Sequence, residues 1–490
     1  MQRRRFLAGV GSLLGIPVPC FANVEAQHVF YDEDFRSLPQ ESCDVLVVGG
    51  GAGGLAAAVS AAEAGAGRVV LIEKNPRLGG DSLISGGYFN AVVPERQIPL
   101  GIVDSVEFFE EQILQSGDGR NDPAVVRTLA AGAGPALRWL EEKGMTFLPQ
   151  VDEIFGSGWR RCFRPILSRG QSYIRALSAA AYSAGVTVRT KTPALRLVKE
   201  GAVLAGAVAK TETGKLVFIR AKRGVVLASG GFAANSSLVR RYAPTAAEMP
   251  VDSQPGNTGE MIEAAQAIGA ALVNMDAVEC VPGSRAGINY PIRLDYIPSR
   301  MIMVDDNGRR FVNEESPRAV VADAILRYGN SPCWAVADAA TLAALDGISQ
   351  KNIYRGLYAG EAYREDTPEK LAEALGLDEA TFLETLRSEP AASRIRTFPL
   401  WAVRMYLRLH ATLGGIRINA KAAVLDASGN TIERLWACGS CTGSVHGRSR
   451  MGGNGLNTAV VFGRQGCSEI TPHLTRIPKN RPQKNGFVNG

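Results

Sequence analysis

The chain has 490 residues, of which 46% are hydrophobic and 21% charged, a balance typical of a globular enzyme with two or three domains. Its net charge of +6 is modest and comes partly from the two ends of the chain, so the composition gives no sign of nucleic-acid binding. Eight cysteines spread over this length do not make a disulfide framework, and four histidines are too few to favour a multi-histidine metal site.

Residues 1–26 have the order of an export signal. Three arginines at 3–5 precede Phe6, Leu7 and an apolar stretch at 8–19, which is shorter than the roughly 20 residues that cross a bilayer. Paired arginines before Phe-Leu match the twin-arginine signal, which exports proteins already folded around a cofactor. The alternative is an ordinary secretory signal rich in arginine. We therefore predict a periplasmic protein without a membrane span.

The mature part of the chain opens with an apolar strand at 44–48 that runs directly into a group of glycines. An alanine-rich helix at 55–64 follows, and then a second apolar strand at 68–72. This order of strand, glycine-rich turn and helix predicts a Rossmann-like dinucleotide site at the turn.

Individual residues of the turn have distinct physical tasks in such a site. Gly49 allows the tight turn, Gly51 lets the backbone approach a pyrophosphate, and Gly54 lets the helix pack on the strand. The start of the helix meets the phosphate charge with its N–H groups. Glu73 follows the second strand, where a carboxylate can accept hydrogen bonds from both ribose hydroxyls of an adenosine.

Segments far from this turn favour FAD over NAD, because a flavin cofactor is long and needs contacts along its whole length. A glycine loop at 79–82 follows the second strand, and a meander at 186–220 returns to a strand at 224–228. A strand at 435–439 leads into another glycine-rich region and an apolar helix. The predicted cofactor residues are Gly49, Gly51, Gly53, Gly54, Glu73, Lys74, Gly79, Gly80, Asp81, Ser82, Ser85, Gly86, Gly87, Ser229, Gly230, Gly439, Ser440, Asn454, Gly455 and Leu456.

Three further motifs follow in order: the segment 308–318 with sequence GRRFVNEESPR, the segment 410–415 with HATLGG, and the segment 446–454 with HGRSRMGGN. With the nucleotide turn, they resemble the flavoprotein subunits of fumarate reductases and succinate dehydrogenases. The chain is most similar to their soluble branch, which includes periplasmic fumarate and urocanate reductases and, more distantly, 3-ketosteroid Δ1-dehydrogenases. The resemblance runs from about residue 44 to about residue 466.

The resemblance implies an α/β fold in which a capping domain is inserted into a Rossmann-like FAD-binding domain of the glutathione-reductase-like type. We expect the FAD-binding domain at 42–275 and again at 401–472, and the α+β capping domain, which holds the substrate, at 276–400. The polar, basic tail at 473–490 is predicted to be disordered.

The same motifs contain residues suited to reducing a carbon–carbon double bond. Hydride transfer to one alkene carbon moves negative charge toward an adjacent carboxylate, which cations can stabilise in the transition state. His410 and Arg450 suit that task, and in the family their counterparts hold the substrate carboxylate. Arg318 matches the family's proton-donating arginine, an unusual acid because a guanidinium rarely gives up its proton.

The family's pocket for a second carboxylate is not reproduced in this chain. In fumarate-specific members a His, a Thr-Glu pair and an Arg precede the Asn-Glu motif. An ungapped comparison puts Val281, Arg293, Leu294 and Ile297 at those positions. We therefore expect a small α,β-unsaturated carboxylate other than fumarate as the substrate.

Other departures concern the proton relay and the flavin. Asp295, Arg300 and Glu315 are the nearby candidates for a rebuilt relay, and the sequence does not choose among them. Ser440 stands where reductases of this family usually carry a Glu near the flavin. No histidine lies at 79–87, where membrane-bound relatives attach FAD covalently, so we expect noncovalent FAD.

The sequence contains no Cys-x-x-Cys-His haem site and no iron–sulfur cysteine cluster, and the close pair Cys438 and Cys441 lacks the following histidine. Electrons must then come from a separate carrier, for which we expect an exported c-type multihaem cytochrome in anaerobic respiration. The prediction is an FAD-dependent oxidoreductase acting on CH–CH bonds. Two alternatives stay open: a dehydrogenase of the 3-ketosteroid Δ1 type, and a noncatalytic flavin-binding protein.

Overall fold

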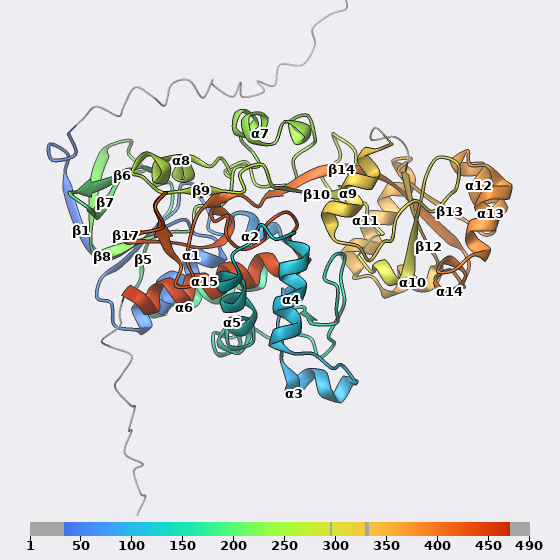
Figure 1. Ribbon diagram of the computed structural model, residues 1–490, viewed down its shortest axis with the longest axis horizontal. Coiled ribbons are helices and arrows are strands. Elements are labelled where there is room, and N and C mark those ends of the chain that lie inside the picture. Colours follow the sequence, from blue (N-terminus) through green and yellow to red (C-terminus); the bar gives the residue numbers. More distant parts are fainter. Residues whose placement is uncertain (1–33, 168, 295, 329–332, 471–490) are drawn as a thin grey trace, which may run out of the picture.

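The computed structural model describes residues 34–167, 169–294, 296–328 and 333–470. The predicted export signal, the predicted disordered tail and Asp295 lie outside the described residues. The described elements form a larger body around one sheet and a smaller body around a second sheet, which we call the cap (Figure 1).

The sheet of the larger body is mainly parallel, with strand order β16-β17-β8-β1-β2-β5. The parallel strands are β17 (Thr431–Ala437), β8 (Leu216–Leu227), β1 (Gln40–Val48), β2 (Val69–Ile72) and β5 (Thr187–Arg189). β16 (Ala423–Leu425) pairs antiparallel at one edge, and β6 (Ala194–Glu200) and β7 (Val203–Lys210) form an antiparallel extension on β8. All four residues of β2 are buried, as expected for a parallel strand covered on both faces.

Two predicted strand boundaries were wrong. Residues 187–189 belong to no meander; they form β5, which pairs parallel with β2 at the edge of the sheet. Residues 224–228 do not begin a separate strand, because β8 starts at Leu216 and continues to Leu227. Its first half pairs with β7 and β1, and its second half with β1 and β17, so one long strand serves both the meander and the parallel core.

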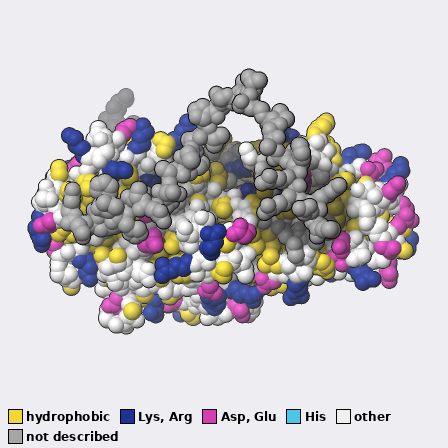
Figure 2. All heavy atoms as spheres, turned by 90° about the horizontal axis from the view of Figure 1, so that it is seen from above, with side chains coloured by type: hydrophobic (Ala, Val, Ile, Leu, Met, Phe, Trp, Pro, Cys, Tyr) yellow, Lys and Arg dark blue, Asp and Glu magenta, His cyan; other side chains and the backbone are white. Residues whose placement is uncertain are grey.

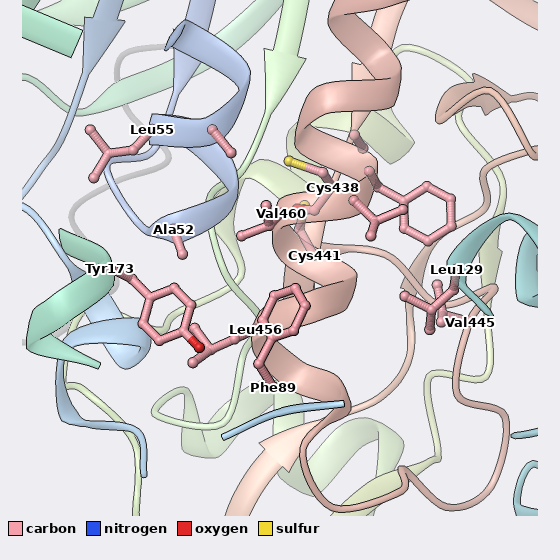
Figure 3. Packing of buried hydrophobic residues seen from close by; sticks show 14 of the residues in the cluster. Ala52, Leu55, Phe89, Leu129, Tyr173, Cys438, Cys441, Val445, Leu456 and Val460 are labelled. Carbon is pink, nitrogen blue, oxygen red and sulfur yellow. The ribbon is translucent and has the colours of Figure 1, made fainter. Parts of the chain in front are cut away.

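The core of the larger body lies where α1 (Ala52–Glu63) packs against α15 (Asn454–Ile470) (Figure 3). A Cβ atom at Gly463 of α15 would lie 2.4 Å from the carbonyl oxygen of Gly53, so the two helices touch through their backbones. In Figure 3, Leu456 at the start of α15 lies near Phe89 and Tyr173, whose rings stack at 6.2 Å. This packing holds the first turns of both helices in fixed positions beside the glycine-rich turn.

The cap is built on an antiparallel sheet with strand order β10-β14-β12-β11. Its strands are β10 (Val278–Gly283), β14 (Leu400–Thr412), β12 (Cys333–Ala337) and β11 (Met301–Val304), and β13 (Ala362–Glu365) pairs with β14. Its helices are α9 (Arg318–Leu326), α10 (Ala339–Ala344), α11 (Gly347–Tyr358), α12 (Pro368–Leu375), α13 (Glu379–Arg387) and α14 (Ala391–Arg394). β10 and the 13-residue β14 join the cap to the larger body (Figure 1).

The remaining elements complete the larger body. The helices are α2 (Gly80–Ile84), α3 (Pro94–Gln97), α4 (Val106–Ser116), α5 (Pro123–Glu142), α6 (Gln171–Ser183), α7 (Ser236–Tyr242) and α8 (Glu260–Ala267). The short strand pairs are β3 (Phe89–Asn90) with β4 (Cys162–Phe163), and β9 (Leu272–Val273) with β15 (Gly415–Ile416). None of the helices in the described part of the chain has the length and apolar character needed to cross a bilayer. Basic and acidic side chains are interspersed on the face shown in Figure 2.

Candidate active site

A cavity of about 660 Å³ begins at the ends of the parallel strands and reaches the cap. Val48, Ile72 and Ala228, which end or directly follow β1, β2 and β8, lie on its wall. Ligands of open α/β sheets bind at this carboxyl edge of the strands. All predicted cofactor residues except Gly54 and Asn454 line the cavity, together with Arg318, His410 and Arg450.

Gly54 and Asn454 do not line the cavity, and both have a packing role in the structure. A Cβ atom at Gly54 would lie 1.9 Å from the carbonyl oxygen of Gly49, which shows how closely α1 approaches β1. Asn454 is fully buried and accepts a hydrogen bond from Asn90 Nδ2 at 2.9 Å, which ties the start of α15 to β3.

The nucleotide end of the cavity has the features that a pyrophosphate and an adenosine need. α1 begins after Gly51, which has no side chain to cap it, and Ser82 Oγ accepts from Ala52 N at 3.1 Å, so the other N–H groups of the first turn remain for an anion. A Cβ atom at Gly51 would come no closer than 3.5 Å to another residue, so the space beside this glycine belongs to the cavity. Glu73 accepts hydrogen bonds from the backbone N–H groups of Gly50 at 2.7 Å and Asn75 at 2.8 Å, which fix its carboxylate on the wall.

Lys74 and Asp81 reach the wall but use their charges within the protein. Lys74 donates to Thr258 Oγ1 at 2.8 Å and forms an ion pair with Glu260. Asp81 accepts from Gln254 N at 2.6 Å and from Asn257 Nδ2. Both residues therefore hold the loop 253–260 beside the cavity.

One residue of this loop offers a free acceptor to a ligand. Asn257 Oδ1 is buried without a hydrogen-bond partner among the described residues, and Asn257 lines the cavity. With the open space at Gly51, this acceptor makes the wall fit an extended dinucleotide. No group of three His, Cys, Asp or Glu side chains within the described ranges could hold a metal ion.

At the cap end, a buried carboxylate joins two of the predicted catalytic arginines. Arg318 begins α9, Arg450 precedes α15, and Glu279 on β10 lies between them. Arg318 Nη1 donates to Glu279 Oε1 at 2.9 Å, and Arg450 Nη2 donates to Glu279 Oε2. The side chain of Glu279 is only 1% exposed, and Arg318 and Arg450 are 12% and 13% exposed. The three residues form one nearly dry ionic network at the cavity.

The charges of this network act on one another. Burial by itself would raise the pKa of Glu279, but the guanidinium groups of Arg450 and Arg318 hold it well below its usual range. Burial lowers the pKa of Arg318, the charges of Arg450 and Arg293 lower it further, and Glu279 opposes them. Arg318 is therefore an arginine that releases a proton more readily than an exposed one.

The side chain of Arg318 is held in one place by its neighbours. A Cβ atom at Gly156 would lie 2.7 Å from Arg318 Cγ, and one at Gly452 would lie 2.7 Å from its Nη2. Arg318 Nε donates to the carbonyl oxygen of Phe155 at 3.0 Å, and the guanidinium lies 5.4 Å from the ring centre of Phe155. The guanidinium is thus preorganised at the cavity wall.

His410, near the end of β14, reaches the cavity together with an aspartate that the sequence did not predict. His410 Nδ1 lies 3.2 Å from Asp252 Oδ2, and both residues line the cavity. Burial would raise the pKa of Asp252, but its hydrogen bond to His410 and the charges of His410, Arg293 and Arg408 lower it overall. Asp252 is therefore ionised at neutral pH. Asp252 lies in a loop without a recognisable motif, so nothing in the sequence pointed to it as a site residue.

His446 and the close cysteine pair contribute no charge to the cavity. Burial, with the nearby charge of Arg450, lowers the pKa of His446 to about 3, so the ring is neutral. Burial raises the pKa of Cys441 to about 11 and that of Cys438 well above its usual range. Both thiols are therefore protonated at neutral pH.

Of the predicted relay candidates, the structure describes Arg300 and Glu315, and it places neither beside Arg318. Arg300 is exposed, and Glu315 is exposed and paired with Arg394 at 3.0 Å. Glu279 takes the position next to Arg318 instead. A signal for it exists in the sequence, since Glu279 is the only charged residue in the otherwise apolar run 277–283.

The four residues at the family's second-carboxylate positions have different locations. Val281 and Leu294 are fully buried away from the wall, and Ile297 is half-buried away from it. Arg293 does line the cavity, with its guanidinium 5.2 Å from the ring centre of Tyr296. Ser440 also lines the cavity.

The two ends of this cavity define a class of protein. One end presents a glycine turn, the start of a helix and the carboxylate of Glu73, and the other groups Arg318, Arg450 and His410 around space for a small anion. This arrangement is that of a flavin-dependent oxidoreductase. The chain belongs to the family defined by the FAD binding domain, whose model matches residues 44–456. Its cofactor is therefore FAD.

Several relatives share most of the chain's length. The chain is 32% identical to a probable fumarate reductase of Shewanella frigidimarina, over 89% of this chain and 76% of that protein. It is 29% identical to the acrylate reductase flavoprotein subunit of Shewanella woodyi, over 94% of this chain and 97% of that protein. The open conformation of a flavocytochrome c3 fumarate reductase superposes with a TM-score of 0.69 at 31% identity, over 89% of this chain and 79% of that chain. The predicted family and fold class are thereby confirmed.

The way FAD is held gives a first prediction. The loop at 79–87 lines the cavity with glycines, serines and Asp81 but contains no histidine that could attach the flavin. We expect purified protein to release all its FAD on acid precipitation, as measured by absorbance of the supernatant. Yellow colour that stays with the precipitate would contradict noncovalent binding.

Proposed function

We propose that this protein is an exported reductase that uses FAD to reduce the carbon–carbon double bond of a small α,β-unsaturated carboxylate other than fumarate. The observation that carries this proposal is the buried network of Arg318, Glu279 and Arg450 with His410 on the same cavity wall. A noncatalytic flavin carrier would have no use for two arginines and a histidine grouped beside the flavin site. The likeness to fumarate and acrylate reductases supports the same reaction class.

The residues divide the reaction between them. When bound, FAD supplies the hydride. Arg450 and His410 hold the substrate carboxylate and draw negative charge toward it, which stabilises the transition state more than the ground state. Arg318 is held on the other oxygen of Glu279, burial lowers the pKa of its guanidinium, and it delivers a proton to the second alkene carbon. Glu279 keeps the two arginines in place and balances part of their charge.

The proposal also covers the electron donor of the reductase and its location in the cell. The chain covers 97% of a relative described as a flavoprotein subunit, which supports a separate electron carrier, for which we propose a c-type multihaem cytochrome. The twin-arginine pattern at residues 3–5 supports export to the periplasm and a role in anaerobic respiration. Cell fractionation tests the location: activity confined to the cytoplasm of the native host would contradict export.

The experiment that tests the reaction is an oxidative half-reaction. Holoprotein reduced with a dye is mixed without oxygen with acrylate, urocanate, aryl acrylates and fumarate, and flavin absorbance is followed. We expect at least one enoate to reoxidise the flavin rapidly. Reoxidation by none of them would contradict the proposal, and reduction of the oxidised flavin by a ketosteroid would favour the dehydrogenase alternative.

The same panel contains a specific prediction for fumarate. Val281 and Leu294 stand where fumarate-specific members carry groups for a second carboxylate, but both are apolar and buried away from the cavity wall, so neither position supplies a partner. Burying an unpaired carboxylate costs several kcal/mol. We therefore expect kcat/KM for fumarate to be at least ~100-fold below that of the best enoate, since about 1.4 kcal/mol corresponds to a factor of ten. Equal turnover of fumarate would contradict this and would assign Arg293 to the second carboxylate.

A further inference from the structure

The segment that carries Asp252 is fixed beside the end of β14 by backbone hydrogen bonds. Leu409 N donates to Pro250 O at 2.9 Å, and Asp252 N donates to Leu409 O at 2.8 Å. These bonds lie directly next to His410 in the chain. The 3.2 Å contact between His410 Nδ1 and Asp252 Oδ2 is thus set by the fold and not by two loose side chains.

This contact leaves one nitrogen of the imidazole for a substrate. Nδ1 faces Asp252, so Nε2 is the nitrogen that can reach an anion in the cavity, where 30% of the His410 side chain is exposed. Asp252 is ionised, because its pKa is lowered by His410 and the surrounding arginines. An ionised carboxylate can only accept a hydrogen bond, so Nδ1 must carry a proton.

A neutral imidazole cannot satisfy both Asp252 and a bound carboxylate. With its single proton on Nδ1, it presents a lone pair at Nε2 to the substrate oxygen. With that proton on Nε2, it presents a lone pair at Nδ1 to the Asp252 carboxylate. Only the imidazolium form donates to both anions.

We infer that Asp252 is a positioning residue that makes His410 bind the substrate carboxylate only as the imidazolium. This inference rests on the proposed function, because it requires a substrate with a carboxylate. Binding then needs a proton on His410. Affinity for an ionised carboxylate is therefore lower wherever the imidazole is neutral.

The other charged groups around the pair keep their charge over this range. They are Glu279 from β10, Arg293 from the cap, Arg408 from β14 and Arg450 from the loop before α15. The pKa of Glu279 is held far below neutral by Arg450 and Arg318, and arginines stay protonated. His446 is neutral, since burial lowers its pKa to about 3. The change in binding with pH is therefore assigned to His410.

The test measures binding of saturated carboxylates, which cannot be reduced. Oxidised holoprotein is titrated with propionate and with 3-phenylpropionate between about pH 5 and 9, and Kd is read from the flavin spectrum. We expect the Kd of the parent protein to rise about tenfold per pH unit in the alkaline part of this pH range. Asp252→Asn should give a nearly constant Kd, because its amide N–H donates to Nδ1 and lets a neutral ring carry its proton on Nε2. Asp252→Ala has neither a carboxylate nor an amide to hold Nδ1, so it should bind both carboxylates weakly at every pH.

A matched control and a second readout separate the possible failures. Asp276→Asn removes the same charge from an aspartate that is paired with Arg120 away from the cavity, and it should keep the pH profile of the parent. Nitrogen-15 NMR of histidine, assigned by loss of the signal in His410→Gln, should show the proton of the neutral ring on Nδ1 in the parent and on Nε2 in Asp252→Asn.

Failure of this inference can be told apart from failure of the proposed function. The same slope of Kd with pH in the parent and in Asp252→Asn, or the same tautomer in both, would overturn the inference even if the protein reduces enoates. If no enoate reoxidises the flavin while the tautomer changes as expected, the proposed function fails and the pairing of Asp252 with His410 stands.

Discussion

Arg318→Ala should slow reoxidation of the reduced flavin by the best enoate by at least ~10²–10⁴-fold, the usual effect of losing a positioned acid. The bound FAD and its spectrum should be unchanged, because Arg318 begins α9 of the cap and contacts no part of the nucleotide turn. Substrate binding should weaken little, since Arg450 and His410 still hold the carboxylate. Stopped-flow absorbance separates the rate of reoxidation from the Kd of the enoate.

Two further variants sharpen this test. Arg318→Lys should recover part of the rate, because a lysine ammonium has a lower pKa than a guanidinium and releases a proton more easily. Arg450→Ala should lose substrate affinity as well as rate, since Arg450 holds the carboxylate. If Arg318→Ala turns over within a few-fold of the parent, the proton comes from another group and the assignment is wrong.

Glu279→Gln is expected to lower the free energy of unfolding at pH 7 by about 3–5 kcal/mol, the cost of removing one partner from a buried ionic network. It would leave the guanidiniums of Arg318 and Arg450 facing each other without an anion. Their repulsion should also displace Arg318, so reoxidation of the flavin by an enoate should slow by at least ~10-fold. Denaturant unfolding and the half-reaction measure the two effects separately.

The pH dependence of this variant has a definite sign. The folded-state pKa of Glu279 is depressed below its ordinary value of 4.5, so its ionised form stabilises the fold fully above that value. That stabilisation is lost as the pH falls toward the folded-state pKa. The difference in stability between the parent and Glu279→Gln should therefore be largest at neutral pH and shrink below pH 4.5.

The cap contains a matched control for Glu279. Glu314 is also fully buried and also joins two arginines, accepting from Arg310 Nη2 and Arg394 Nη1 at 2.8 Å each, but it does not line the cavity. Glu314→Gln should destabilise the protein to a similar extent while the folded molecules keep the parent's reoxidation rate. A parent-like rate in Glu279→Gln would show that Glu279 has only the structural role of Glu314.

The nucleotide site was predictable because its signal is local. Gly49 and Gly54 meet directly where helix and strand approach, and this contact depends on six consecutive residues and their flanking elements. Arg318, His410 and Arg450 could be named only through the order of family motifs. Nothing in their own surroundings in the sequence shows that they share one cavity.

Glu279 stands out as a lone charge in an apolar run, but neither it nor Asp252 could be placed at the site from the sequence, because distant pairings bring both of them there. Glu279 reaches Arg318 through the register of β10 on β14, in which it stands opposite Ala411, the neighbour of His410. Asp252 reaches His410 through hydrogen bonds between its loop and Leu409. For the same reason the sequence marks Lys74 and Asp81 only as cofactor residues, whereas the structure shows that their charges hold the loop 253–260.

The pairing of β10 with β14 also makes the cap a separable module. Val278 and Thr412 are register partners, so the chain leaves the larger body and returns to it at the same point (Figure 1). Insertions and substitutions between these residues can reshape the substrate wall, including Arg293 and Tyr296, without altering the turn at Gly49–Gly54 that faces the nucleotide. Substrate range and cofactor affinity are thereby open to independent change in evolution, and exchange of this one insert between relatives is a direct route to new enoate specificities.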